Sequence, residues 1–124
     1  MPASSPARCS MFTGRFPSAT HVRTNHNVRD IHYAKDLVAV LKENHYKTAL
    51  VGKNHGYLSS KDMDFWSEYS HWGKNKPVTE GERAISEFFK ESVGQCLEPS
   101  PIPVKDQQPT RIVDEAIEWI DSQK

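Results

Sequence analysis

This sequence has little of what marks a membrane, disulfide-rich or nucleic-acid-binding protein. Its two cysteines are too few for a disulfide scaffold, and no C-x-x-C pair suggests structural zinc. Its 16 basic and 16 acidic side chains cancel, so it lacks the basic excess that phosphate backbones and anionic membranes attract. No apolar run approaches the roughly 20 residues of a transmembrane helix. We therefore expect neither nucleic acid nor membrane among its partners.

Apolar residues are also scarce, at 36% of the 124 residues. That fraction is low for a self-sufficient domain. The length fits one ordinary domain with a modest core. We therefore expect part of the core to be supplied from outside this chain.

Hydrophobic periodicity predicts four helices and one strand. Ser5 is expected to cap the first helix, with Pro6 at its first position and Gly14 as its stop. Thr79 and Glu82 have the spacing of a capping box, which predicts the start of a later helix. The helices are expected at about residues 5–13, 31–46, 79–92 and 110–123, and the strand at 48–51.

A helix followed closely by a buried-type strand is half of a βαβ unit, which predicts an α/β fold with a parallel sheet. The expected apolar face of the 31–46 helix comprises Ala34, Leu37, Val38 and Leu41. One strand cannot make a sheet, so its neighbours are expected outside this chain. Residues 56–78 are expected to form a surface excursion, and residues 98–109 a proline-rich linker.

The stretch "SSPARCSMFTGR", residues 4–15, combines a predicted helix start with a cation. A helix N-terminus attracts anions because it carries free N–H groups and partial positive charge. Arg8 is badly placed for that dipole, and a bound anion would relieve the conflict. The same residues are also compatible with a serine-capped helix bearing a solvated arginine.

A second cluster follows the predicted strand, where "ALVGKNHG" places Lys53 and His55 two residues apart. If the chain stays extended there, both side chains point the same way. The carboxyl ends of parallel strands are where α/β sheets bind ligands. A lysine would neutralise an oxyanion, and a histidine would hydrogen-bond it or move a proton. A surface Lys/His pair in a glycine-flanked loop is the simpler alternative.

Both stretches resemble the sulfatase family. The first matches Cys/Ser-x-Pro-x-Arg followed by Thr-Gly-Arg, with Ala7 where serine is commoner. The second, "HYKTALVGKNH", resembles the family's Thr-Ala-Leu-Val-Gly-Lys-x-His stretch, with Asn54 where tryptophan is common. The ending "RIVDEAIEWI" looks like the family helix that precedes its next core strand. The resemblance implies that residues 1–124 are part of an alkaline-phosphatase-like α/β catalytic domain with a mixed or parallel sheet.

The resemblance also implies a mechanism for sulfate ester hydrolysis. Ser4 would be oxidised to formylglycine by an iron–sulfur radical maturase, and its hydrated aldehyde would attack sulfur. Arg8 would hold the modified residue and the sulfate, while Lys53 and His55 would bind sulfate oxygens. Calcium would bind beside Ser4, through ligands mostly outside this chain, including an Asp-Asp pair on an earlier strand. We therefore expect the chain to lack that strand and the C-terminal portion, and to be inactive alone.

Several alternatives stay open at this stage. The nucleophile would also suit a phosphonate or phosphate ester hydrolase, and a non-catalytic interaction module is a further reading. Cys9 to Arg15 satisfies C-x5-R, the loop of cysteine phosphatases, although it lacks the glycine-rich cradle. His21 or Asn25 would approach a substrate if the loop after Thr-Gly-Arg resembles the family's. Trp66, Tyr69 and Trp72 would line a sugar or aryl subsite or pack in the core.

The expected partners follow from the same resemblance. They are a small-molecule or glycan sulfate ester and the formylglycine-generating radical maturase. Exposed apolar helix faces would also allow self-association. The family is often periplasmic or secreted, although residues 1–30 lack the charged-then-apolar order of a secretory signal.

Overall fold

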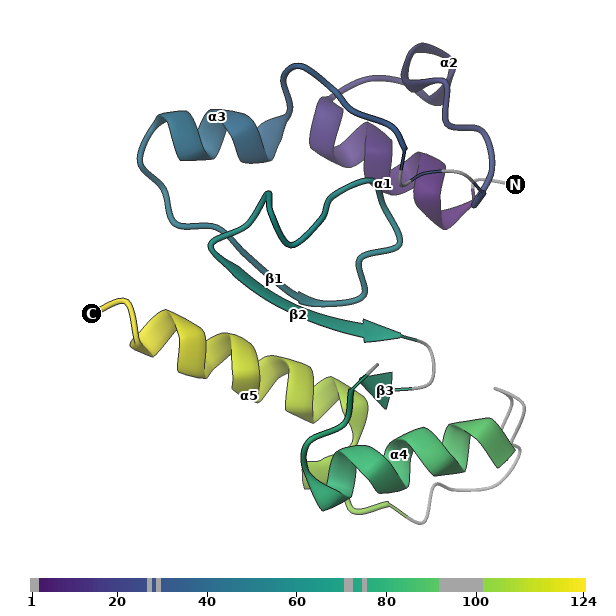
Figure 1. Cartoon of the computed structure of the whole chain (residues 1–124), viewed down its shortest axis with the longest axis vertical. Coiled ribbons are helices and arrows are strands. Elements are labelled where there is room, and N and C mark those ends of the chain that lie inside the picture. The colour runs from purple at the N-terminus through teal and green to yellow at the C-terminus, as the bar shows by residue number, and fades with distance from the viewer. Residues whose placement is uncertain (1–2, 27, 29, 71–72, 75, 92–101) are drawn as a thin grey trace. The chain divides into compact units, whose positions relative to one another are not determined.

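A computed structural model describes residues 3–26, 28, 30–70, 73–74, 76–91 and 102–124. Among these, three helices come first along the chain, three short strands follow, and further helices come after the strands (Figure 1). They are α1 (Ser4–Thr13), α2 (Pro17–Thr20), α3 (Leu37–Glu43), β1 (Ala49–Gly52), β2 (Phe65–Ser70), β3 (Gly73–Lys74), α4 (Glu80–Glu91), the 3-10 helix η1 (Val104–Asp106) and α5 (Gln108–Asp121). Within the described ranges, none of the helices has the length and apolar character needed to cross a bilayer.

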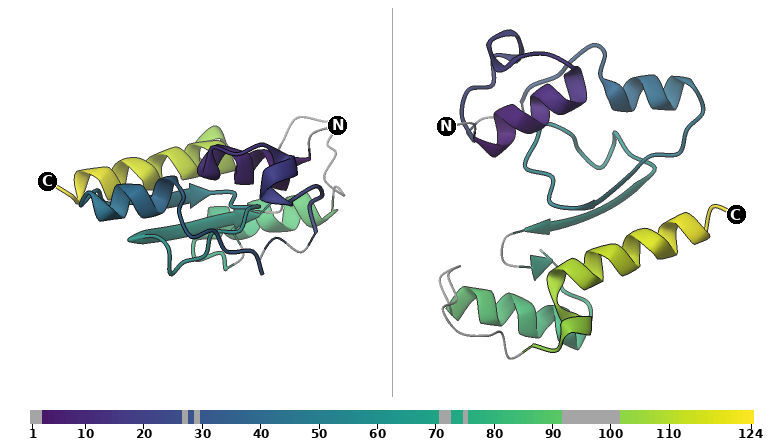
Figure 2. Two further views of the ribbon diagram at one scale, coloured as in Figure 1. Left: turned by 90° about the horizontal axis from the view of Figure 1, so that it is seen from above. Right: turned by 180° about the vertical axis from the view of Figure 1, so that it is seen from behind.

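The chain divides into two compact units. Unit 1 comprises Met1–Leu50 and Asn54–Trp66, and unit 2 comprises Val51–Lys53 and Ser67–Lys124. Unit 1 contains the first three helices, with α1 packed against α2 and α3 (Figure 2). Unit 2 contains β3, α4, η1 and α5.

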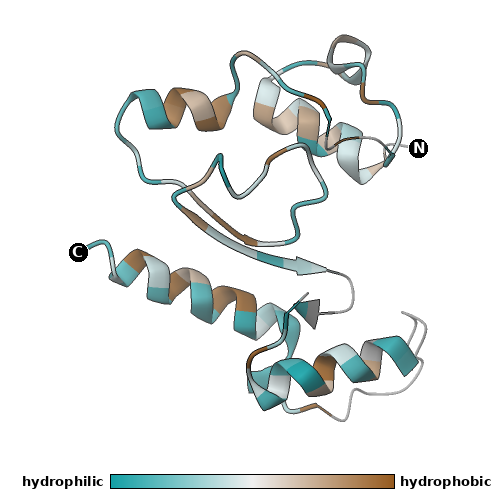
Figure 3. Cartoon of the chain, in the orientation of Figure 1, coloured by the Kyte–Doolittle hydropathy of each residue, from teal (hydrophilic) through white to brown (hydrophobic). Residues whose placement is uncertain are grey.

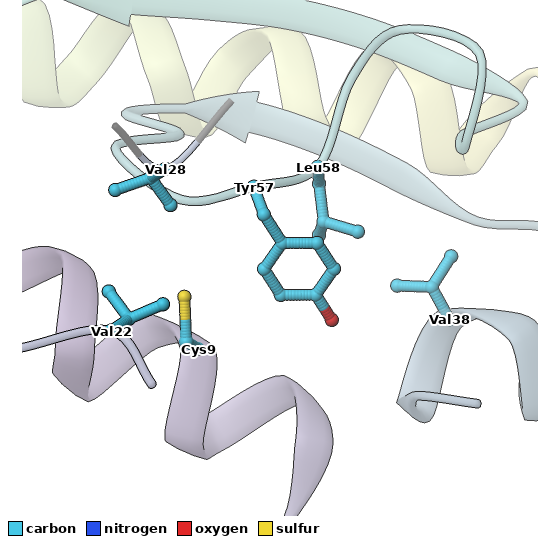
Figure 4. Close-up of a cluster of buried hydrophobic side chains, with 6 residues drawn as sticks. All are labelled: Cys9, Val22, Val28, Val38, Tyr57 and Leu58. Atoms are coloured by element: carbon cyan, nitrogen blue, oxygen red, sulfur yellow. The ribbon is translucent and has the colours of Figure 1, made fainter. Parts of the chain in front are cut away.

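Unit 1 is held together by an apolar core around α1. The Cys9 side chain points into this cluster, between Val22 and Tyr57 (Figure 4). The ring of Tyr57 meets the ring of Tyr33 edge-to-face, with 4.7 Å between the centroids. The buried members are Cys9, Val22, Val28, Val38, Tyr57 and Leu58. Their burial fixes α1 against the segment that follows β1.

Helix α3 is much shorter than the expected 31–46 helix. It begins at Leu37 because the Asp36 side chain accepts a hydrogen bond from the Ala39 amide at 2.8 Å, an N-cap that stops propagation toward Ile31. Only part of the expected apolar face packs inward: Val38 is buried, whereas Ala34 and Leu37 are exposed. The expectation that Ala34 belongs to this face is therefore wrong.

The three strands form one sheet in the order β1-β2-β3. β1 and β2 run in the same direction (Figure 1), whereas β2 and β3 are antiparallel, with Tyr69 opposite Lys74. The parallel pair and the flanking helices confirm the α/β fold class. Two expectations are corrected, because residues 65–70 are a strand rather than part of a surface excursion, and a partner of β1 lies within this chain.

Helix α4 confirms the predicted capping box. The Glu82 amide donates to Thr79 Oγ1, and the Thr79 amide donates to Glu82 Oε2, both at 3.2 Å. Gly81 lets η1 approach this first turn, because a Cβ there would meet Asp106 Oδ1 at 2.8 Å. Inside the expected 98–109 linker, residues 104–106 form η1, while residues 98–101 lie outside the described part of the chain.

Unit 2 is joined by a network of charged side chains. Lys74 Nζ lies 3.2 Å from Glu115 Oε1 and 3.8 Å from Glu82 Oε1, and Arg111 Nη2 lies 3.7 Å from the same Glu82 oxygen. The Tyr69 hydroxyl donates to Glu115 Oε2 at 2.9 Å. The network links β2 and β3 to α4 and α5.

The apolar stripe predicted for the last helix lies along α5, and much of it is open to solvent. Apolar positions recur along this helix (Figure 3). Val113, Ile117 and Ile120 are 55%, 52% and 55% exposed, while Ile112 packs against the backbone of Gly52. The expectation of exposed helix faces is confirmed for α5.

Candidate active site

Helix α1 carries two of the four predicted site residues. Ser4 and Arg8 are four positions apart, which places them on one face of the helix. The Arg8 Nε–H group donates to Ser4 Oγ at 3.4 Å, and both side chains are half-buried. Gly14, at a φ of 67°, ends the helix in the left-handed conformation that the sequence predicted. The guanidinium therefore lies beside the hydroxyl of the candidate nucleophile.

The N-terminus of α1 is capped differently from the prediction. Ala3 occupies the N-cap position, and Ser5, the predicted cap, lies inside the helix. The Ser5 amide donates instead to Asn25 Oδ1 at 3.0 Å. Pro6 has no N–H group, and the Ala7 amide bonds to the Ala3 carbonyl. The Ser5 and Ala7 amides thus already donate hydrogen bonds within the protein, and Pro6 has no amide hydrogen to donate. Anion binding here therefore depends on side chains more than on the helix terminus.

The segment after β1 is held against the first turn of α1. Ser5 Oγ donates to the His55 carbonyl at 2.9 Å. Next along the chain, Gly56 is buried with its Cα hydrogen toward Arg8, since a Cβ there would lie 3.8 Å from Arg8 Cβ. Unit 1 thus brings Ser4, Arg8 and His55 to one end of α1. The expectation of extended backbone is wrong at His55, whose φ of 45° lies in the left-handed region.

The residues after His55 explain why this segment stays in place. Asn54 Nδ2 donates to the Leu58 carbonyl at 2.8 Å, which closes a turn, and Leu58 itself is buried. The Tyr57 hydroxyl donates to Asp36 Oδ2 at 2.6 Å. Burial, followed by this hydrogen bond, raises the pKa of Tyr57, so the phenol remains a donor. The His55 loop is therefore anchored to α3 as well as to α1.

Lys53 belongs to unit 2 and is half-buried. Its participation beside Ser4, Arg8 and His55 stays a prediction from the sequence. The boundary between the units lies directly after Lys53, and the next two residues, Asn54 and His55, belong to unit 1.

Cys9 is a core residue and does not resemble an active thiol. It is 0% exposed, and burial raises the pKa of its thiol above the ordinary value. A phosphatase nucleophile needs the opposite, an accessible thiolate with a lowered pKa. The C-x5-R alternative is therefore excluded by the position of Cys9.

The remaining candidates divide between surface and core. His21 and Asn25 are exposed, and Asn25 Oδ1 accepts the hydrogen bond from the Ser5 amide in the first turn of α1. Trp66 packs against the core of unit 1, which favours the packing alternative over a sugar subsite. Tyr69 is 2% exposed and bonded to Glu115 in unit 2. Trp72 lies outside the described residues.

The donor set for calcium is incomplete in the described part of the chain. No group of three or more His, Cys, Asp or Glu side chains there is arranged to hold a metal ion. Ser4 alone offers one oxygen, whereas calcium takes six to eight. The described residues do not form the calcium site that the resemblance implies, so no chemical step is derived through that ion.

Sequence reasoning missed one residue of this site, Ser5. It was assigned to capping, while its hydroxyl joins two segments that are 50 residues apart. No local sequence pattern predicts such a contact. The one signal in the sequence is that Ser5 directly follows the candidate nucleophile Ser4.

Comparison with protein families places the chain in a known family. The family model described as Sulfatase matches residues 1–124, the whole chain. No curated protein and no solved structure matches the chain at the significance required.

Proposed function

Because this chain belongs to the sulfatase family of hydrolases, we propose that Ser4 is its nucleophile precursor and that Arg8, Lys53 and His55 bind the sulfate group of an ester substrate. The observation that carries the proposal is the hydrogen bond from Arg8 Nε to Ser4 Oγ at 3.4 Å. It supports a role in which one cation contacts both the nucleophile and the sulfate.

The chemistry would require oxidation of Ser4. Loss of two protons and two electrons from the CH2OH group, taken up by an iron–sulfur radical maturase, would give the aldehyde of formylglycine. A hydrated aldehyde would supply one oxygen to attack sulfur and a second hydroxyl whose deprotonation expels sulfate. An unmodified serine hydroxyl is a weak nucleophile without an activating base.

The residues of this chain would supply charge and orientation. Arg8 has a delocalised cation that matches two sulfate oxygens, and α1 has no acidic residue in its first turn to compete for it. The His55 imidazole would hydrogen-bond a sulfate oxygen or give a proton to the departing alcohol. Lys53 would neutralise charge that develops on the sulfate.

Two parts of the proposal extend beyond the described residues. Calcium would need several further oxygen ligands beside Ser4, so we propose that they come from outside this part of the molecule. We also propose that residues 1–124 do not turn over a substrate without those ligands. Detectable sulfatase turnover by this chain alone would overturn the second proposal.

Mass spectrometry of the chain co-expressed with a serine-type radical maturase tests the central claim. The peptide containing Ser4 should be about 2 Da lighter than the encoded peptide, because oxidation of an alcohol to an aldehyde removes two hydrogens. Ser4→Ala should abolish the change, while Ser10→Ala, a control serine on the same helix, should leave it intact. An unmodified Ser4 in the presence of an active maturase would contradict the assignment and favour a non-catalytic module.

Titration with inorganic sulfate and inorganic phosphate, followed by the His55 ring resonances, tests the anion. Stronger binding of sulfate supports the sulfatase assignment. Stronger binding of phosphate would favour the phosphate or phosphonate ester hydrolase instead.

A further inference from the structure

Ser5 uses both of its hydrogen-bonding groups on distant parts of unit 1. Its amide donates to Asn25 Oδ1 at 3.0 Å, and its hydroxyl donates to the His55 carbonyl at 2.9 Å. The side chain is 0% exposed, so water does not replace either partner. A residue adjacent to Ser4 therefore joins three segments that are far apart in the sequence.

The bond to His55 restrains a backbone that would otherwise relax. A φ of 45° is in the left-handed region, which is unfavourable for a residue with a Cβ. Such a conformation persists only where the surroundings determine it. The hydroxyl of Ser5 holds the His55 carbonyl, and the burial of Tyr57 and Leu58 holds the chain that follows.

We infer that Ser5 is a positioning residue that sets the separation and orientation of Ser4 and His55. This inference rests on the proposed function of those two residues. Without the Ser5 hydroxyl, the peptide plane between His55 and Gly56 loses this restraint, and a backbone return to negative φ would redirect the imidazole. Displacement of about 1 Å is enough to impair an aligned site by up to about a hundred-fold.

Asn25 completes the arrangement from the other side. Its amide oxygen occupies the N–H group of Ser5, which fixes the first turn of α1 while the hydroxyl of Ser5 fixes the His55 loop. Asn25 is exposed, so its replacement removes this bond without opening the core.

The test compares Ser5→Ala with Ser10→Ala in the full chain by NMR. Ser10 is on the same helix, and its buried hydroxyl has no hydrogen-bond partner among the described residues, so it is a matched control. The first readout is the backbone coupling constant and Cα shift of His55, which report φ. The second is the affinity for inorganic sulfate.

Ser5→Ala should move His55 toward negative φ and weaken sulfate binding about five-fold, the equivalent of one lost hydrogen bond. Ser10→Ala should change neither. Asn25→Ala should weaken sulfate binding less and leave the φ of His55 in place.

Unchanged His55 backbone signals and unchanged sulfate affinity in Ser5→Ala would overturn the inference. If the wild-type chain does not bind sulfate, the proposed function fails, whereas the backbone signals of His55 still test Ser5. Should Ser5→Ala not fold, Ser5→Cys has nearly the same size and only a weak S–H donor. The same change at His55 is expected from it, and wild-type signals there would reject the role of Ser5.

Discussion

Units 1 and 2 are stabilised by opposite kinds of interior. Unit 1 buries apolar side chains around α1, with Cys9, Val38 and Leu58 at 0–5% exposure. Unit 2 buries Tyr69 and Ile85 but also Glu82, and ion pairs between charged side chains join its strands to its helices. The apolar stripe of α5 in unit 2 stays largely exposed.

The difference shows where a precise site can be built in this chain. Ser4, Arg8 and His55 lie on segments that the apolar core of unit 1 fixes, and apolar packing does not depend on the charge state of its side chains. The charged side chains of unit 2 are interdependent, because Lys74 and Arg111 share the buried Glu82, and removal of one partner leaves a buried or partly buried charge with less compensation. Unit 2 should therefore be the part of the molecule more sensitive to changes in charge.

The largest effect is expected from Glu82→Ala. The Glu82 carboxylate caps α4 and faces both Lys74 and Arg111. Its loss leaves the Val78 and Thr79 amides without their acceptor and removes one counter-charge from each cation, although Lys74 keeps Glu115. Unit 2 should be destabilised by about 3–5 kcal/mol. Urea unfolding followed by amide resonances of each unit measures this. Glu80→Ala, an exposed residue in the same first turn, is the control and should cost about 0.5 kcal/mol or less. An equal loss in unit 1 would contradict the comparison.

A somewhat smaller effect is expected from Leu58→Ala in unit 1. Leu58 is 4% exposed in the cluster that anchors the His55 loop. A cavity at this position should destabilise unit 1 by about 2–4 kcal/mol. The same urea experiment reports it, and Leu37→Ala, at a leucine that is 48% exposed, serves as the control. If both leucine variants behaved alike, the apolar core would not be what holds unit 1.

Acid should affect unit 2 before unit 1. The hydrogen bonds and cations around Glu82 and Glu115 outweigh their burial, and the pKa of each carboxyl lies below the ordinary 4.5. Such groups stabilise the folded state above pH 4.5, and this contribution is lost as the pH falls through their lowered pKa. In unit 1, hydrogen bonds from Thr48 also lower the pKa of Asp64, but that carboxylate is exposed.

NMR spectra recorded from pH 6 to pH 2.5 measure this difference. Cross-peaks of α4 and α5 should disappear before those of α1 and α3. If the cross-peaks of α1 and α3 disappeared first, the carboxylates of unit 2 would not be a source of acid sensitivity.

The smallest effect on stability is expected from Ile117→Glu on α5. Ile117 is 52% exposed, so the free energy of unfolding should change by about 0.5 kcal/mol or less. Since the stripe of α5 is our proposed surface for self-association, sedimentation velocity should show less association in this variant. Val104→Glu, at a valine that is 72% exposed outside α5, is the matched control. Equal association in the two variants would locate the contact elsewhere.

Features carried by neighbouring residues could be predicted from the sequence. The capping box of Thr79 and Glu82 and the Gly14 stop of α1 were visible because each involves contacts within one turn. The pairing of Ser4 with Arg8 follows from helical spacing in the same way. These parts of the fold and of the candidate site are local.

The missed features depend on distant partners. Residues 65–70, "FWSEYS", do not alternate regularly between apolar and polar side chains, and the sequence alone did not show that Ser67 and Tyr69 would be the buried face of a strand. The late start of α3, at Leu37, depends on the N-cap from Asp36, whose second oxygen accepts a hydrogen bond from Tyr57, 21 residues later. The role of Ser5 depends on His55, 50 residues away. Contacts of this range have no signature in composition or periodicity.

The burial of Cys9 gives unit 1 its own sensor of local opening. A thiol at 0% exposure with a raised pKa reacts with an alkylating reagent only while the surrounding packing is transiently broken. In a Cys96→Ser background, the labelling rate of Cys9 would report how often α1 separates from the His55 loop. Cys9, which the sequence offered as an alternative nucleophile, thereby measures the transient opening of the apolar core that holds the candidate active site.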